Sequence, residues 1–420
     1  MKKVIIVSYH FPPYGGKAVQ RASKLAKYLP EFGWKPVIFT MPLDEHGVPV
    51  DYTLLEELPL DIEIYRPPFR NWRKLIPYSI RKHLFSPLPD GYRYWIDAVE
   101  NRLIQIIKTK GTHALITTSP THSAHLLGLR AKLKTGIPWV ADFRDPWTGH
   151  PDFSAKKHAD KLRIMETVVI KMADAIVGVV PNILSSFTER VPSEKLFLIE
   201  NGYDEDDFKD IPTEFSVSHE ALWIGYNGTV SEYHNPTPLL ESVASLLASG
   251  SIKPGDIHIT FTTDKRGNKW FPPFAHLIKS GILKVQEYLP HTESITWLSK
   301  MDVLLLLVTK GKDIYTGKVF EYFYLGDPIL ALGTSGDDLD RLLRETHSGT
   351  ITDYRDPAVI KQTILDLLEK KKSGKLARLP QGRQEIQKFS RRNIARRYAE
   401  LLDELTVGES AISSFHKQGR

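Results

Sequence analysis

A cation and a carboxylate three residues apart, Lys318 and Glu321, mark the part of this sequence where ligand chemistry is easiest to recognise. They follow an apolar run at residues 302–308, whose length and flanks predict a buried strand. Residues 317–326 predict a short helix, because a glycine stands at each end. Residues three apart share one helical face, so both charges would lie at the helix entry. Since open α/β sheets bind ligands beyond the carboxyl ends of their strands, the pair is either a ligand site or an ordinary ion pair.

The composition is that of a globular protein long enough for two domains. Of the 420 residues, 41% are hydrophobic and 25% are charged. There is no cysteine, which excludes disulfides, thiolate metal sites and cysteine nucleophiles. No stretch reaches the roughly 18 apolar residues of a membrane span, and the first apolar run is too short for a signal peptide. We therefore expect a soluble, cytoplasmic protein.

The positive charge is concentrated in one segment of the first half. Residues 1–200 carry 28 Lys and Arg against 20 Asp and Glu, whereas residues 201–420 carry 28 against 30. Residues 64–89 hold no acidic residue and six basic ones, interleaved with aromatic and aliphatic side chains: Arg66, Arg70, Arg73, Lys74, Arg81 and Lys82. Such a segment could rest on an anionic membrane surface, form a solvated loop or bind an anionic acceptor. No nucleic-acid-binding motif accompanies it, so nucleic acid is not an expected partner.

The first half reads as a parallel βαβ series. A strand at 4–9, a loop at 10–16, a helix and a strand at 36–40 follow one another. Gly15 and Gly16 lie just before the helix, where backbone N–H groups could approach a phosphate. A simple Gly-Gly turn is the other interpretation.

Two polar clusters follow later strands of this half. His122 comes after the strand predicted at 114–118, with His125 one turn on. A metal at this histidine pair lacks a third ligand, so no metal is expected. Asp142, Arg144 and Asp145 end the next strand, and they are either acceptor-side residues or a structural ion network.

A second α/β series begins after an acidic, proline-containing stretch. Its first strand, at about 222, ends in the loop of Asn227, Gly228 and Thr229. We therefore predict four segments: an N-terminal Rossmann-like acceptor-side domain, a C-terminal Rossmann-like nucleotide-sugar domain, a C-terminal helix packing back toward the first domain, and a flexible tail, at 1–203, 204–380, 381–407 and 408–420. The fold class is α/β, with two Rossmann-like domains facing across a cleft.

Several of these motifs, in this order and spacing, also occur together in a known family. They are residues 11–16 with Arg21, residues 142–147, residues 199–204 and residues 318–328. From residue 1 to about 400 the chain resembles the GT-B glycosyltransferases of family four. These are retaining enzymes, which include bacterial cell-envelope mannosyl- and glucosyltransferases.

The resemblance implies retaining, metal-independent transfer of a hexose from a nucleoside diphosphate sugar. The acceptor would be an envelope glycan, a lipid-linked sugar or an exopolysaccharide, and no cofactor is needed. Glu321 matches the second glutamate of the family's E-x7-E motif, which holds the ribose, and Asp313 stands at the first acidic position, at the donor sugar. Lys318 looks like the phosphate partner, with Val319 beside it, and Gly15 and Gly16 would face the diphosphate. His122 matches a histidine near the transferred sugar.

One departure from the family lies in the loop after the first strand of the second domain. The family usually has an arginine after the glycine and a lysine about five residues later, whereas Thr229 follows Gly228 here and His234 stands near the lysine position. The missing charge could come from one of four basic residues: Arg21, Lys265, Arg266 or Lys318. Two alternatives stay open, a non-catalytic nucleotide-sugar-binding subunit of an envelope assembly complex and a sugar-nucleotide epimerase of the same fold.

Overall fold

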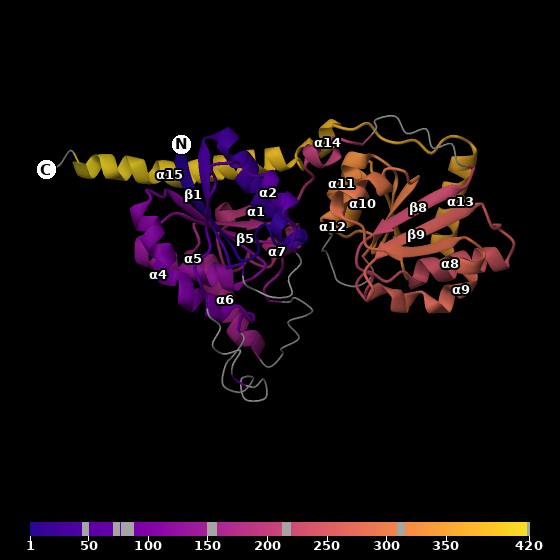
Figure 1. Ribbon diagram of the computed structural model, residues 1–420, viewed down its shortest axis with the longest axis horizontal. Coiled ribbons are helices and arrows are strands. Elements are labelled where there is room, and N and C mark those ends of the chain that lie inside the picture. The colour runs from indigo at the N-terminus through magenta and orange to yellow at the C-terminus, as the bar shows by residue number, and fades with distance from the viewer. Residues whose placement is uncertain are drawn as a thin grey trace. The chain divides into compact units, whose positions relative to one another are not determined.

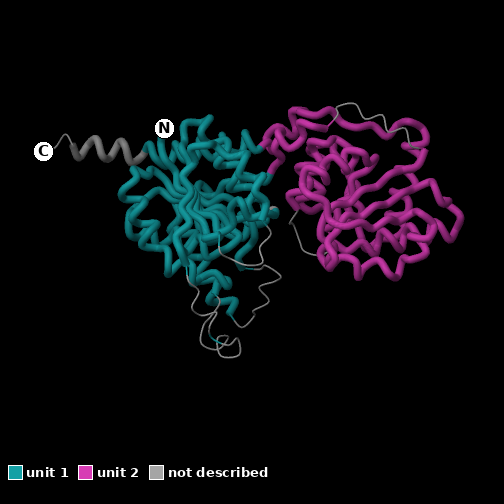
Figure 2. The backbone as a smooth tube through the Cα atoms, viewed as in Figure 1, with its two compact units in different colours: residues 1–201, 391–420 teal, residues 202–390 magenta. Residues whose placement is uncertain are grey.

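The computed structural model describes residues 1–43, 50–69, 76, 88–148, 158–211, 220–308 and 316–417. The chain divides into two compact units, residues 1–201 with 391–420 (unit 1) and residues 202–390 (unit 2), which Figure 2 draws in different colours. Each unit contains one parallel sheet with helices between its strands (Figure 1). The predicted class, α/β with two Rossmann-like domains, is confirmed.

Unit 1 contains a seven-stranded parallel sheet in the order β3-β2-β1-β4-β5-β6-β7. Its strands are β1 (Lys2–Ser8), β2 (Trp34–Phe39), β3 (Glu63–Tyr65), β4 (Ala114–Thr118), β5 (Trp139–Phe143), β6 (Ala175–Gly178) and β7 (Leu196–Leu198). The central strands are buried on both faces, which explains their nearly continuous apolar sequences. The strand order reverses between β1 and β4, so a ligand site is expected at the carboxyl ends of these two strands.

Helices cover both faces of this sheet. They are α1 (Lys17–Tyr28), η1 (Leu29–Phe32), α2 (Thr53–Glu56), α4 (Arg93–Thr109), α5 (Ser123–Thr135), α6 (Ala159–Met172), α7 (Pro181–Ser185), η4 (Ser193–Lys195) and α15 (Arg391–Lys417). The last helix packs on α1, and its Ile394, Tyr398 and Leu402 lie in the same buried cluster as Val4 and Ala22. Figure 1 shows α15 running along unit 1.

The end of the chain differs from the single helix predicted at 381–407. The structure has a short α14 (Gln384–Gln387) in unit 2 and a separate α15 in unit 1. The helix is interrupted between α14 and α15 because Ile386 and Phe389 are buried in unit 2, whereas Ile394 is buried in unit 1. Helix α15 also continues through Lys417, into the segment predicted as a flexible tail. Gly408 is its one strong helix-breaking residue, at a cost of about 1 kcal/mol.

Unit 2 contains a six-stranded parallel sheet in the order β10-β9-β8-β11-β12-β13. Its strands are β8 (Leu222–Asn227), β9 (Ile257–Thr263), β10 (Leu283–Glu287), β11 (Val303–Leu307), β12 (Ile329–Gly333) and β13 (Gly349–Asp353). The strand order reverses between β8 and β11, as it does between β1 and β4 in unit 1. A second ligand site is therefore expected at the carboxyl ends of β8 and β11.

The helices of unit 2 pack against both faces of its sheet. They are η5 (Glu205–Phe208), α8 (Thr237–Ala248), η6 (Gly267–Trp270), η7 (Pro272–Phe274), α9 (Ala275–Lys279), α10 (His291–Leu298), α11 (Lys318–Leu325), α12 (Asp338–Glu345), α13 (Pro357–Lys372) and α14. The helix predicted from its bounding glycines is α11, and Gly326 ends it in the left-handed conformation (φ 81°). Helices α8 and α13 pack against each other and share one core with β8.

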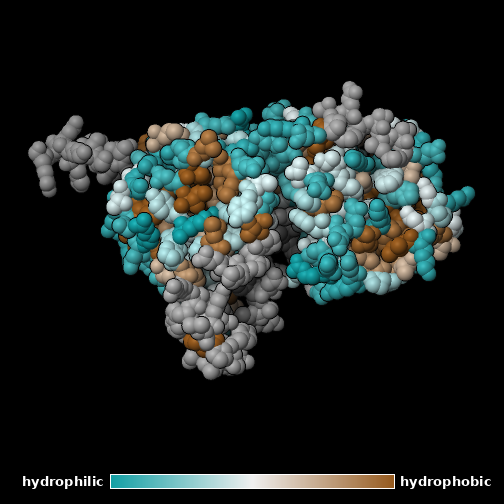
Figure 3. Space-filling view, in the orientation of Figure 1, coloured by the Kyte–Doolittle hydropathy of each residue, from teal (hydrophilic) through white to brown (hydrophobic). Residues whose placement is uncertain are grey.

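The basic segment at 64–89 lies mostly outside the described residues, which omit 70–75 and 77–87. Within the described part, the Arg66 guanidinium donates to the carbonyl oxygens of Met41 and Pro12. None of the helices that the structure describes is both apolar enough and long enough to cross a membrane. The face drawn in Figure 3 is largely polar, with separate apolar patches on both units.

Candidate functional site

Lys318 is a buried cation at the carboxyl edge of the unit 2 sheet. It is the first residue of α11 and is only 6% exposed. Its Nζ lies 4.4 Å from the centroid of the Tyr226 ring and 3.4 Å from the Tyr226 hydroxyl oxygen. Tyr226 lies near the end of β8, and burial raises the pKa of its hydroxyl above the usual range. The ammonium is therefore held at the point where the strand order reverses.

Gly228 is the residue that allows Lys318 to approach the β8 backbone this closely. Its φ of 141° is a conformation that side chains rarely adopt, and a Cβ at this position would overlap Lys318 Nζ. The family pattern has an arginine immediately after this glycine, where the chain has Thr229. The structure instead brings the Lys318 ammonium to this loop from α11, which follows β11.

The rest of the predicted loop is held by hydrogen bonds inside unit 2. Thr262 Oγ1 donates to Asn227 Oδ1 (2.8 Å), and the Gly228 N–H donates to the Thr262 carbonyl oxygen (2.9 Å). The Tyr226 hydroxyl donates to the Thr229 carbonyl oxygen (2.8 Å). Asn227, Gly228 and Thr229 thus form a fixed backbone edge beside Lys318.

Glu321 lies in the first turn of α11 and contacts a residue that the sequence did not single out. His291 Nε2, on α10, lies 3.2 Å from Glu321 Oε1. Lys318 contacts Tyr226 on β8, so the two charged residues of α11 contact different elements. The side chain of Glu321 keeps 24% of its surface exposed, so its carboxylate can be reached from solvent. Val319 is 0% exposed, so its side chain lies in the core, and its assignment to the donor site stays a prediction. Asp313 lies outside the described residues.

Arg21 and Asp142 form a buried ion pair in unit 1, and this corrects two predicted site residues. Both side chains are fully buried, and Arg21 Nε and Nη2 lie 2.9 Å and 3.1 Å from the two carboxylate oxygens of Asp142. The guanidinium also donates to the carbonyl oxygens of Ile199 and Glu200 and to the Tyr398 hydroxyl. Because these bonds occupy the guanidinium, Arg21 has no N–H group left for a phosphate. The carboxylate of Asp142 is likewise occupied and buried, so it cannot contact an acceptor. The structural ion network is the correct interpretation of Asp142.

Arg144 and Asp145 follow Asp142 at the end of β5. The Arg144 guanidinium donates to the Ala18 carbonyl oxygen (2.6 Å), and burial lowers the pKa of this group. Asp145 is half-buried. The acceptor-side assignment of these two residues stays a prediction.

His122 lies directly before α5, beyond the carboxyl end of β4. It is 4% exposed and stacks on Trp147, with ring centroids 5.2 Å apart. The carboxylate of Asp90, a residue that the sequence did not single out, accepts from Ser123 N (2.9 Å) and from Ser123 Oγ (2.6 Å). Burial raises the pKa of Asp90. Asp90 therefore fixes the helix end that carries His122.

His125 faces the core of unit 1. Its Nδ1 lies 2.8 Å from Thr117 Oγ1, and its ring stacks on Phe143 at 4.3 Å. Burial lowers the pKa of His125 to about 3. These contacts make it a neutral core histidine.

The depressed pKa of His125 predicts a loss of stability in mild acid. An unfolded histidine takes up a proton near pH 6.5, whereas the folded one stays neutral to about pH 3, so stability falls as pH decreases between these values. Below about pH 6, this histidine lowers the free energy of unfolding by about 1.4 kcal/mol per pH unit, and we expect His125→Phe to abolish that contribution. Urea unfolding at pH 7, 6 and 5 measures this difference. Identical pH slopes for the variant and the wild type would contradict the assignment.

Gly15 and Gly16 lie at the start of α1, as predicted. Gly16 has a φ of 92° and is the residue before Lys17, the first residue of the helix. This conformation favours glycine and leaves the backbone at the helix entry without a side chain. Their contact with a diphosphate stays a prediction.

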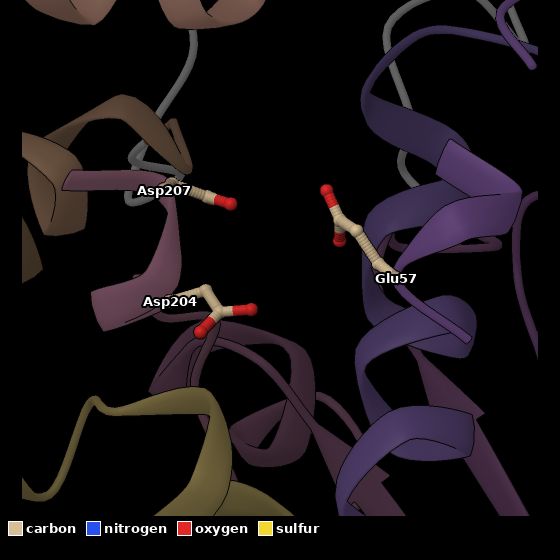
Figure 4. Close-up of side chains that lie close together, drawn as sticks. All are labelled: Glu57, Asp204 and Asp207. Carbon is tan, nitrogen blue, oxygen red and sulfur yellow. The ribbon is translucent and has the colours of Figure 1, made fainter. Parts of the chain in front are cut away.

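Two of the three acidic residues drawn in Figure 4, Glu57 and Asp204, have local roles within their own units. In unit 1, Glu57 accepts from Lys24 Nζ (2.6 Å). In unit 2, Asp204 accepts from the Asp206 N–H and so caps η5, which contains Asp207. These contacts explain the Glu57 carboxylate as an ion-pair partner and the Asp204 carboxylate as a helix cap.

Comparisons with known proteins agree with this architecture. Residues 17–202 match the family described as glycosyl transferase 4-like domain. No curated protein matches the chain. Sucrose-phosphate synthase from Thermosynechococcus elongatus is similar in structure, with a TM-score of 0.65, 14% identity, and coverage of 97% of this chain and 100% of that one.

Two further solved structures are similar over nearly their whole length. Anabaena HepE in complex with UDP has a TM-score of 0.62 and 13% identity, covering 96% of this chain and 100% of that one. The lipopolysaccharide outer core galactosyltransferase WaaB has a TM-score of 0.56 and 15% identity, covering 99% and 100%. At these identities the likeness shows the fold, which is the predicted GT-B fold.

Proposed function

We propose that this protein is a glycosyltransferase that moves a sugar from a nucleoside diphosphate sugar to a hydroxyl group of an acceptor. The observation that carries the proposal is the position of Lys318. Its buried ammonium lies against Gly228 at the reversal point of the unit 2 sheet, where a ligand is expected. The match of residues 17–202 to a glycosyl transferase 4-like domain supports the same reaction class.

The proposed reaction requires positive charge beside the diphosphate, and we assign this role to Lys318. Breaking the bond between the sugar and the diphosphate leaves negative charge on the phosphate oxygens, and fixed cations and N–H groups stabilise that charge in the transition state. Lys318 supplies a partly desolvated ammonium, and the first N–H groups of α11 add the positive end of a helix dipole. One lysine could thus replace the arginine and lysine that the family usually has.

The other donor contacts follow from the resemblance. Glu321 would accept hydrogen bonds from the ribose hydroxyls, and Asp313 would contact hydroxyls of the donor sugar. His122 would contact the transferred sugar, with Gly15 and Gly16 at the diphosphate. We propose transfer with retention, without a metal ion and without a cofactor.

The proposed acceptor follows from the resemblance. An envelope glycan, a lipid-linked sugar or an exopolysaccharide agrees with the resemblance, and Arg144 and Asp145 are the remaining acceptor-side candidates. Contact with an anionic membrane surface through residues 64–89, on the cytoplasmic side, is part of the same proposal.

A non-catalytic nucleotide-sugar-binding subunit is the second candidate. The absence of the arginine and lysine after Gly228 favours it, because the diphosphate would then be bound with less positive charge than the family provides. It predicts that a nucleoside diphosphate sugar binds and is never turned over.

The proposal is tested first by ligand binding. A ligand that binds only the folded protein raises the melting temperature, so UDP, GDP and ADP and their common sugars are screened by thermal shift in EDTA. We expect the nucleotides of one base to raise the melting temperature of the wild type. Glu321→Ala should lower the affinity for that nucleotide by about 10- to 100-fold, since a hydrogen bond to a charged group contributes about 1.5–3 kcal/mol. Glu287→Ala, an exposed carboxylate change on β10, is the control. No stabilisation by any of these ligands, or equal affinity for Glu321→Ala, would contradict the donor site.

A further inference from the structure

The contact between His291 and Glu321 joins the first turns of two different helices. His291 is the first residue of α10, and Glu321 is the fourth residue of α11. The imidazole Nε2 and the carboxylate Oε1 are 3.2 Å apart, and the two side chains keep 37% and 24% of their surface exposed. The pair therefore lies at an accessible edge of unit 2, where a ligand can reach it.

The direction of this hydrogen bond follows from the chemistry of the two groups. An ionised carboxylate only accepts hydrogen bonds, so the imidazole Nε2 carries the hydrogen and donates it to Glu321. A hydrogen bond to a partner on another helix limits the rotamers that a glutamate side chain can adopt. The bond restrains the carboxylate and so sets the directions in which its other lone pairs accept.

The position of His291 is itself fixed by the fold. Helix α10 packs against β8, with Ile295 and Leu298 buried, and Ser294 Oγ donates to the His291 carbonyl oxygen (2.7 Å). Pro290 stands directly before the histidine and restricts the backbone at the helix entry. The imidazole is therefore attached to a rigid part of unit 2.

We infer that His291 is a positioning residue that orients Glu321 and thereby sets the selectivity of the site for a ribose ring. This inference rests on the proposed function, because it requires that Glu321 accepts from a ribose hydroxyl. His291 acts through Glu321 and need not touch the nucleotide. Its loss should lower the affinity for ribonucleotides and leave the affinity for nucleotides without the hydroxyl unchanged.

The test is a comparison of ribo- and deoxyribonucleotide binding by calorimetry. UDP, GDP and ADP, and the 2′-deoxy and 3′-deoxy forms of each, are titrated into the wild type, His291→Ala and His291→Gln. The wild type should prefer the ribonucleotide of its own base over at least one deoxy form. We expect this preference to be about threefold to tenfold smaller in His291→Ala, which is the usual effect on binding of an unrestrained side chain. The dissociation constant of that deoxy form should stay unchanged. His291→Gln, whose amide N–H can replace Nε2–H, should restore most of the preference.

The controls separate positioning from folding and from a failure of the proposed function. His276→Ala changes an exposed histidine on α9 of the same unit and should change neither preference nor affinity. A uniform loss of affinity for ribo and deoxy forms in His291→Ala would show a structural role and overturn the inference. A preference equal to that of the wild type would overturn it too, with the proposed function intact. If none of the three nucleotides binds the wild type, the proposed function fails and the inference with it.

Discussion

Replacing Lys318 by methionine is expected to lower the turnover of a nucleoside diphosphate sugar by about 100- to 1,000-fold, the usual effect of removing one donor that stabilises transition-state charge. Methionine keeps an unbranched apolar side chain at this position, so the change removes mainly the ammonium, which lies 4.4 Å from the centroid of the Tyr226 ring. Because this charge acts most strongly on the leaving diphosphate, the loss should appear in kcat more than in KM.

Steady-state assays of nucleoside diphosphate release, made in EDTA, measure this effect. Lys279→Met is the matched control, because Lys279 is an exposed lysine on α9 of the same unit. The melting temperature of Lys318→Met should stay close to that of the wild type. A variant that is folded and keeps a turnover within a few-fold of the wild type would show that another cation neutralises the diphosphate.

Replacing Arg21 by methionine is expected to destabilise unit 1 by about 3–5 kcal/mol, the range for removing one partner of a buried ion pair. Asp142 would remain buried with its charge unbalanced, and the carbonyl oxygens of Ile199 and Glu200 would lose their donor. Arg21→Met combined with Asp142→Leu should recover much of the loss, since replacing both charges by apolar side chains is often neutral.

Hydrogen exchange followed by mass spectrometry suits this measurement, because it reports on peptides of unit 1 and unit 2 separately. We expect faster exchange in β5 and α15 of Arg21→Met and unchanged exchange in the unit 2 sheet. Unchanged exchange in unit 1, together with a loss of nucleotide affinity, would return Arg21 to the donor site where the sequence placed it.

The parts that could be predicted from the sequence are those in which neighbouring residues determine the structure. Helix α11 was located because Gly317 and Gly326 bound an apolar run that follows a strand. Lys318 and Glu321 could be placed at its entry because the spacing of three residues fixes their common face. Two α/β units followed from the alternation of buried strands and helices.

The parts that escaped prediction depend on residues far apart in the chain. Arg21 reaches Asp142 and Tyr398, which lie 121 and 377 positions away, and no local pattern indicates such a pair. His291 contacts Glu321 across 30 residues, and its only sequence signal is a histidine opening a helix after a proline. Val319 is next to Lys318 in sequence, but the turn of the helix directs its side chain into the core.

The central claim is that this protein transfers a sugar from a nucleoside diphosphate sugar with retention and without a metal ion. The most direct measurement is NMR of the sugar nucleotide that the binding screen identifies, incubated with the wild type in EDTA. We predict release of the nucleoside diphosphate, with the transferred sugar keeping its anomeric configuration. Binding without any release, release only after Mg²⁺ is added, or conversion of the donor to an isomer would contradict the account.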